Sequence, residues 1–241
     1  MTAKRSEQLP LALDHPPQLG REDLLDSPVL AAAIAIVDRW PDWPSPVVVL
    51  VGPPGSGKSH LAAIWAEASG AGAIRAEAGG DAADLAASAP VLLEDADRTG
   101  FDETSLFHTI NSVREHGTAL MITARSRPSR WGVQLPDLAS RLKAATVVEI
   151  GAPDDDLVAR LLVKLFADRQ LFPDDRLIAY LVARMERSME AARALVETMD
   201  RLALARGVRL SRALAAEALE RIGHGDGGKD KADEGDGDGR H

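Results

Sequence analysis

The spacing of hydrophobic positions changes along this chain, and that change predicts two kinds of structure. Residues Val47–Val51 form an unbroken aliphatic run, mostly β-branched, which is typical of a central parallel strand buried on both faces. Four more short apolar runs alternate with helical stretches, at Ala73–Arg75, Val91–Leu93, Ala119–Thr123 and Thr146–Ile150. This alternation predicts an α/β fold class with a parallel sheet.

Helical periodicity dominates on both sides of these strands. Ser27 is a good N-cap and Pro28 suits the first helical position, so we expect a helix from Pro28 to Arg39. After Pro153 the strand pattern ends, and four helices are expected over Asp154–Leu171, Asp174–Glu186, Ser188–Arg206 and Ser211–Arg221. The expected organisation is a flexible arm at residues 1–26, an α/β domain at 27–151, a small all-α domain at 152–222 and a disordered acidic tail at 223–241.

A glycine-rich segment joins the first strand to a helix expected from Lys58 to Ala68. It fits the phosphate-loop pattern G-x-x-x-x-G-K-[ST] in full, between a buried strand and a helix start; the alternative is a Gly/Pro turn that binds nothing. Glycines let backbone N–H groups surround a phosphate, Lys58 is expected to reach the outer phosphates, and Ser59 is expected to offer its hydroxyl to Mg²⁺. The predicted phosphate-binding residues are Gly52, Pro53, Pro54, Gly55, Ser56, Gly57, Lys58 and Ser59.

An acidic pair follows the predicted strand Val91–Leu93. A phosphate loop needs a carboxylate at the end of a neighbouring strand to hold the metal and to orient water. We expect Glu94 to be a metal ligand and Asp95 to be the catalytic carboxylate, although their order reverses the common Asp-Glu. Asp97 is an alternative for either role. Alternatively, Glu94 and Asp95 have no chemical role and are simply the solvated end of a strand.

The composition of the chain excludes several kinds of chemistry and several kinds of partner. The 241 residues contain no cysteine, which excludes disulfides, thiol catalysis and iron–sulfur clusters. The formal net charge of −9 gives no overall basic field for duplex DNA, so we expect no direct sequence-specific DNA binding. No apolar run approaches the roughly 18 residues of a membrane span, and no basic-then-apolar leader follows Met1. We therefore expect a cytoplasmic protein with no membrane partner.

Three segments together resemble the AAA+ ATPases of the DnaA family. They are Gly52–Leu61, Glu94-Asp95 and Leu135–Leu142, and the similarity runs from Ser27 to Ile222. Within that family the chain is most similar to the Hda and HdaA regulators of alphaproteobacteria. The resemblance implies an AAA+ P-loop sheet domain followed by a small all-α lid, with ADP or ATP and Mg²⁺ bound between them and His60 among the nucleotide contacts.

The resemblance also implies a function and partners. Gln8, Leu9, Leu11 and Leu13 resemble the peptide by which such regulators bind the sliding clamp, the β subunit of DNA polymerase III. Alternatively, these leucines pack on the chain's own domain. No basic recognition helix follows Ile222, which fits a regulator that promotes hydrolysis of DnaA-bound ATP better than an initiator. The alternative is an active AAA+ ATPase that loads or remodels a replication protein. The sequence does not decide whether the chain also forms a homo-oligomer.

Several arginines match functional positions of that family. Arg141 matches the arginine finger that stabilises charge on a neighbouring subunit's nucleotide; its alternative is a surface residue capping a helix. Arg187 falls at the sensor-two position that contacts nucleotide, with Arg193 as the alternative register. Arg125 stands where the sensor-one strand usually ends in an acidic or amide residue. This departure, together with the reversed Glu94-Asp95 order, implies weak intrinsic hydrolysis.

Overall fold

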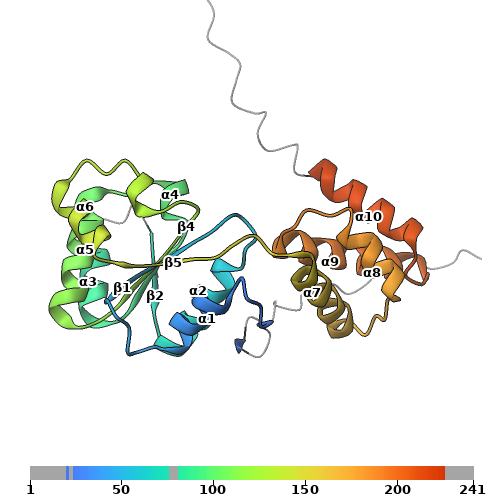
Figure 1. Cartoon of the computed structure of the whole chain (residues 1–241), viewed down its shortest axis with the longest axis horizontal. Helices are drawn as coiled ribbons and strands as arrows, with labels where there is room; N and C mark the ends of the chain where they lie inside the picture. Colours follow the sequence, from blue (N-terminus) through green and yellow to red (C-terminus); the bar gives the residue numbers. More distant parts are fainter. Residues whose placement is uncertain (1–19, 22–23, 76–80, 226–241) are drawn as a thin grey trace, which may run out of the picture.

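The computed structural model describes residues 20–21, 24–75 and 81–225, and it contains a parallel α/β sheet followed by a group of helices (Figure 1). All four strand pairings are parallel, and the strand order is β2-β3-β4-β1-β5. This confirms the predicted fold class. The strands are β1 (Val47–Val51), β2 (Gly72–Ile74), β3 (Val91–Leu93), β4 (Leu120–Ala124) and β5 (Thr146–Glu149).

Helices flank the sheet, and the described segment after β5 contains helices joined by short connections. The helices of the sheet-containing part are α1 (Ala31–Asp38), α2 (Lys58–Ser69), α3 (Asp81–Ser88), α4 (Ala96–Thr99), α5 (Glu103–His116), the 3₁₀ turn η2 (Pro128–Arg130) and α6 (Pro136–Lys143). Those of the second part are α7 (Asp155–Asp168), α8 (Asp175–Val182), α9 (Met189–Arg206) and α10 (Arg212–Gly225). None of the described helices is both long enough and apolar enough to cross a membrane.

Strand β1 lies between β4 and β5, and all five of its residues are buried. Its register pairs Val49 with Ile122 on one side and with Val147 on the other. Because the strands are parallel, their carboxyl ends share one edge of the sheet. The segments that follow β1, β3 and β4 are therefore brought together at that edge, where ligands bind in open α/β sheets.

Two hydrophobic clusters hold the molecule together. One packs α1 and α2 on a face of the sheet and continues into α7–α10; Trp65 and Phe166, both fully buried, belong to it. The other joins the opposite face to α3, α5 and α6 through residues such as Ile110 and Leu138. The first cluster contains side chains of both parts of the chain, so the second part shares a core with the first.

Some predicted boundaries are wrong by a few residues. Residues 28–30 form a turn in which the Leu30 N–H donates to the Ser27 carbonyl at 3.0 Å, and α1 begins only at Ala31. The Ser27 hydroxyl accepts from the Val29 N–H at 3.4 Å, so it stabilises this turn instead of capping a helix. Helix α8 ends at Val182 instead of Glu186, whereas α10 runs to Gly225, beyond the predicted Arg221. Strands β2 and β4 are each displaced by one residue from prediction.

The described end of the predicted arm is attached to the folded part. Arg21 donates two hydrogen bonds to the carboxylate of Asp38 on α1, both at 2.9 Å. Arg160 on α7 donates to the Asp26 carbonyl at 2.8 Å. Leu24 and Leu25 pack against the first cluster. These contacts attach the segment before α1 to α1 itself and to α7.

Candidate functional site

The predicted phosphate loop connects β1 to α2. Gly55 and Gly57 have φ angles of +67° and +94°, a region that residues with a Cβ rarely adopt. A Cβ on Gly52 would lie 2.6 Å from the Ile150 carbonyl oxygen at the end of β5. The glycines of the motif are thus required both by the turn and by close backbone approach, as a phosphate cradle requires.

Two polar side chains of this loop, those of Ser56 and Lys58, are buried and therefore shielded from water. Lys58 is 6% exposed, and its Nζ donates to the carbonyl oxygens of Gly52 at 2.7 Å and Pro53 at 2.8 Å. Burial lowers the pKa of Lys58, and the positive charge of Arg125 adds to this effect, while Asp95 and Asp97 oppose it. The Ser56 hydroxyl is fully buried and has no hydrogen-bond partner within the described residues. Both groups would gain a partner from a bound phosphate oxygen, so the loop fits an anionic ligand.

The predicted carboxylates follow β3, but they lie in different surroundings. Glu94 is exposed, whereas Asp95 is half-buried at a φ of +50° and its N–H donates to the Thr123 hydroxyl at 2.9 Å. Arg98 lies 3.8 Å from the Asp95 carboxylate. The negative charges of Asp95 and Asp97 both act to raise the pKa of Lys58, so the two carboxylates lie within electrostatic range of the phosphate loop. The metal-ligand role of Glu94 and the catalytic role of Asp95 remain predictions.

Asp97 has a positioning role that the sequence did not indicate. Its carboxylate accepts from the N–H groups of Arg125 and Ser126, at 2.9 and 2.7 Å, and from the Ser126 hydroxyl at 2.6 Å. Burial alone would raise the pKa of Asp97, but these hydrogen bonds outweigh it and lower the pKa. Asp97 therefore ties α4 to the segment after β4 and holds Arg125 near the phosphate loop.

The start of α9 rests directly on the phosphate loop. The Met189 N–H donates to the Gly55 carbonyl at 2.8 Å. A Cβ on Gly55 would lie 2.3 Å from the Ser188 hydroxyl oxygen, and one on Gly57 would lie 3.1 Å from the Met189 sulfur. Ser188 also caps α9 by accepting from the Ala191 N–H at 3.0 Å. Only the three-dimensional structure shows that Ser188 and Met189 belong to the site.

The two arginines considered for the lid occupy different positions. Arg187 is exposed and donates to both carboxylate oxygens of Asp155, at 2.6 and 3.1 Å, and this ion pair raises the pKa of Arg187. Arg193 lies 3.3 Å from the Nδ1 of His60 on α2, the residue after Ser59. The structure thus brings Arg193, the alternative register, to the helix that begins at the phosphate loop. A nucleotide contact by Arg187 or His60 stays a prediction.

The predicted magnesium ligands follow β1 and β3, at the carboxyl edge of the sheet. Ser59 is exposed at the start of α2. Among the described residues no group of three or more His, Asp or Glu side chains could hold a metal ion. A magnesium ion held by the Ser59 hydroxyl, one carboxylate after β3 and phosphate oxygens stays a prediction.

Arg141 lies away from the chain's own phosphate loop. Helix α6 packs on the second cluster through Leu138 and Leu142, and Figure 1 shows it at the end of the molecule opposite α7–α10. Arg141 is half-buried, and no ion pair of its side chain is found within the described residues. The predicted clamp-binding residues Gln8, Leu9, Leu11 and Leu13 lie outside the described part of the chain.

Two known proteins are similar in sequence to part of this chain. No family model matches the sequence. The chain is 30% identical over 119 residues to the chromosomal replication initiator protein DnaA of Sphingopyxis alaskensis, covering 48% of this chain and 26% of that protein. It is 27% identical over 103 residues to an uncharacterized protein of Haemophilus influenzae, covering 42% and 45%. The matched regions thus cover less than half the length of either relative.

Solved structures match most of the chain. Domain III of the Thermotoga maritima replication initiation protein DnaA has a TM-score of 0.71 at 15% identity, with 85% of this chain and 97% of that one covered. AMPPCP-bound DnaA from Aquifex aeolicus has a TM-score of 0.63 at 18% identity, covering 87% and 70%. The RuvB Holliday junction branch migration motor of Thermotoga maritima gives 0.62 at 18%, covering 84% and 70%. The chain therefore has an AAA+ fold like that of DnaA domain III.

Proposed function

We propose that this chain binds an adenine nucleotide at the phosphate loop and uses it as a switch in the control of replication initiation. The observation that carries the proposal is the loop itself, in which Lys58 is buried and the Ser56 hydroxyl has no partner among the described residues, while Gly55 contacts the start of α9. Adenine specificity is supported by the fold, which DnaA bound to AMPPCP shares at 18% identity. ADP and ATP both fit this proposal.

The residues of the site have distinct parts in nucleotide binding. Lys58 exchanges its bonds to the Gly52 and Pro53 carbonyls for bonds to phosphate oxygens, and its attraction to the phosphate charge is strengthened there because the site is buried. Bound Mg²⁺ would neutralise phosphate charge, with Ser59 and either Glu94 or Asp95 as protein ligands. Asp95, close enough to act on Lys58, is suited to orient water and accept its proton.

The lid contact explains how occupancy changes the molecule. Gly55 lies in the phosphate loop and accepts from the first residue of α9, while Arg193 on the same helix reaches His60 after the loop. A nucleotide that reshapes the loop therefore changes the support of α9. Since α9 packs against α7 and α10, a change at its start would be transmitted to these helices.

We further propose that the switch acts on DnaA, in the manner of the regulatory group that the sequence resembles. Arg141 would enter the nucleotide site of ATP-bound DnaA and promote hydrolysis there, while Gln8–Leu13 hold the chain on the sliding clamp. Support comes from the resemblance, from the partial match to DnaA and from the position of Arg141, which has no ion pair among the described residues. A guanidinium in such a role contributes ~10³–10⁵ in rate.

A reconstituted reaction tests this role. ATP–DnaA, clamp loaded on DNA and the purified chain are mixed, and loss of DnaA-bound ATP is followed over time. Arg141→Ala should abolish the stimulation, whereas Lys143→Ala, an exposed basic residue on the same helix, should retain it. Stimulation that survives Arg141→Ala at the wild-type rate contradicts the finger assignment.

The clamp interaction is tested separately. Gln8→Ala should weaken retention on clamp-loaded DNA and leave nucleotide affinity unchanged. Nucleotide affinity is measured by calorimetry and retention by surface-immobilised clamp. If the substitution lowers both quantities equally, the arm is part of the folded nucleotide-binding unit and the clamp proposal fails.

An active ATPase that loads or remodels a replication protein is the second candidate. The observation that favours it is Asp95, a half-buried carboxylate close enough to act on Lys58, together with a fold shared with the RuvB motor. Steady ATP turnover by the purified chain alone, lost in Asp95→Asn, would support this candidate. A nucleotide-locked regulator would show no such turnover.

A further inference from the structure

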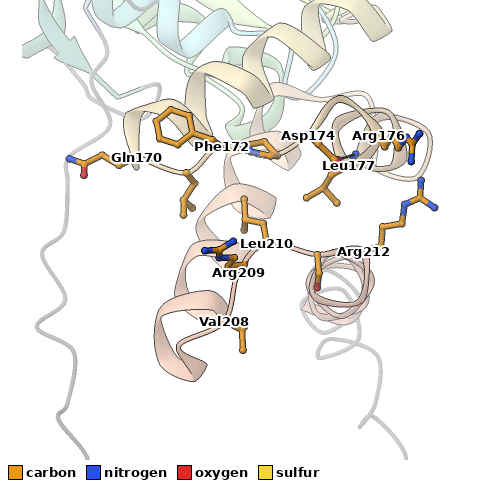
Figure 2. Close-up of a pocket in the computed structure, with 12 residues that line it drawn as sticks. Gln170, Phe172, Asp174, Arg176, Leu177, Val208, Arg209, Leu210 and Arg212 are labelled. Carbon is orange, nitrogen blue, oxygen red and sulfur yellow. Dashed lines mark hydrogen bonds between the residues drawn. The ribbon is translucent and has the colours of Figure 1, made fainter.

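A large groove lies at the lid, away from the phosphate loop, between the α7–α8 and α9–α10 connections (Figure 2). Its volume is ≈ 940 Å³. Buried Leu177 and half-buried Leu210 contribute apolar surface to it. Phe172, on the α7–α8 connection, is 84% exposed, and Val208 on the α9–α10 connection is 47% exposed. A benzyl group left in water beside an apolar depression is typical of an interaction surface.

Positive charge surrounds this apolar surface. Arg176, Arg209 and Arg212 line the groove and are all exposed, and Figure 2 shows the Arg176 and Arg212 side chains on the same side of the view. No ion pair links any of the three to a carboxylate of the described residues. Asp174 also lines the groove, but its carboxylate accepts from the Leu177 N–H at 2.7 Å as the cap of α8.

A further arginine lies close to this group, beside Tyr180 of α8. The Arg184 guanidinium lies 4.1 Å from the centre of the Tyr180 ring, and that of Arg212 lies 5.7 Å from it. These cation–π contacts hold the two arginines near one aromatic face without neutralising them. In a chain whose net charge is −9, these arginines form a local group of positive charge that can attract carboxylates.

We propose that this lid groove docks an acidic segment of a protein partner that carries large apolar side chains. The arginines complement carboxylates, and Phe172, Leu177 and Leu210 complement the apolar anchors. The chain's own residues 226–241 are acidic, but Ala232 is their only apolar side chain, so they would leave Phe172 uncovered. A nucleic acid is also negatively charged, but it lacks large aliphatic side chains for the Leu177 and Leu210 surface, so an acidic protein segment fits the groove better.

Fluorescence anisotropy with labelled probes tests the proposal on the full chain. The probe is the peptide Glu-Glu-Leu-Phe-Glu-Glu-Leu-Glu, compared with a version whose Leu and Phe are Ser and with a fifteen-residue oligothymidylate. Phe172→Ala and Arg209→Glu should each weaken binding of the first peptide about tenfold, since both side chains line the groove. The matched controls Leu204→Ala and Arg114→Glu change exposed residues outside the groove and should stay within twofold.

Each outcome decides for or against the groove. Retained binding of the first peptide by both groove variants overturns the proposal, as does equal binding of the Ser-substituted peptide. Tighter binding of oligothymidylate, lost in the same variants, assigns the groove to nucleic acid instead. If changing the acidic residues of 226–241 to amides raises peptide affinity tenfold or more, the groove is occupied by the chain's own tail. Circular dichroism checks the fold; Phe172 is so exposed that its removal should not disturb it.

Discussion

Lys58 and Ser56 show how single residues of the phosphate loop are held ready for a ligand. Lys58 is buried and satisfied by two carbonyl oxygens, so its charge is kept at a cost in hydration that is reflected in its lowered pKa. Ser56 is buried without a partner, which costs stability in the protein alone. A bound phosphate would supply the Ser56 hydroxyl with a partner and Lys58 with an opposite charge, as the proposed function requires.

Ser56→Ala tests this interpretation at the residue scale. Removing a buried hydroxyl that has no partner should raise the free energy of unfolding by about 1 kcal/mol, measured by urea denaturation without nucleotide. Nucleotide affinity, measured by calorimetry, should fall in the same variant. A loss of stability larger than 1 kcal/mol would instead mean that the hydroxyl has a partner within the protein.

Asp97 provides a pH-dependent prediction. Its folded-state pKa lies below the ordinary 3.8, so its stabilising contribution is complete above that value and is lost as the pH falls through the lower folded pKa. Asp97→Ala should lower the free energy of unfolding by about 2 kcal/mol at pH 7, because bonds from Arg125 and Ser126 are lost. Denaturation curves should show this difference shrinking in strong acid. Asp42→Ala, at an exposed carboxylate, should change stability by less than about 0.5 kcal/mol at either pH.

At the scale of elements, the decisive contact joins the phosphate loop to α9. The helix begins at Met189 because Ser188 supplies the cap, and the same Ser188 hydroxyl fills the space beside Gly55. A single residue thus ends the connection from α8, starts α9 and sets its distance from the loop. Any side chain at position 55 would have to displace this helix start.

Gly55→Ala is expected to separate the loop from the lid. The added Cβ would meet Ser188 at 2.3 Å and the φ of +67° would strain any L residue, so nucleotide affinity should fall at least tenfold. Gly117→Ala is the matched control: its φ is +69° but nothing lies within 4 Å of the added Cβ. Calorimetry should find unchanged nucleotide affinity for the control, with a loss of about 1 kcal/mol in stability. Equal affinities for the two variants would contradict a role for the contact with α9.

At the scale of the whole molecule, one hydrophobic cluster passes from the sheet into the lid. Trp65 under the sheet and Phe166 in α7 belong to this same cluster, and the Trp43 and Trp65 rings stack 5.0 Å apart within the same region. The start of α9 also contacts Gly55 of the phosphate loop, so a ligand bound there would lie where both parts meet. Its binding energy should stabilise the entire chain and not the sheet alone.

Thermal unfolding checks this expectation. ADP or ATP with Mg²⁺ at about 100 times the dissociation constant should stabilise the folded chain by ~2.7 kcal/mol and raise its Tm. Lys58→Ala should abolish the shift, because Lys58 is the buried cation of the loop. The two parts should unfold together in the nucleotide complex, followed by tryptophan fluorescence and by circular dichroism. A Tm unaffected by either nucleotide would contradict binding at the loop.

The sequence by itself determined the elements and the location of the phosphate loop, because these depend on local properties. An aliphatic run predicted β1, the glycine pattern predicted the loop, and the side chains of Asp154, Asp174 and Ser188 cap α7, α8 and α9. Helix α1 was placed too early because a Ser-Pro pair suits a turn as well as a cap. Such local signals cannot decide between alternatives that differ only in packing.

Only the tertiary structure decided which distant residues form the site. Arg193 on α9 lies beside His60 of α2, whereas Arg187, just before α9, pairs with Asp155 of α7. Asp97 holds the Arg125 segment across a separation of 28 residues, and Ser188 meets Gly55 across a larger one. These contacts depend on strand order and helix packing, which bring together residues whose spacing in the chain carries no signal.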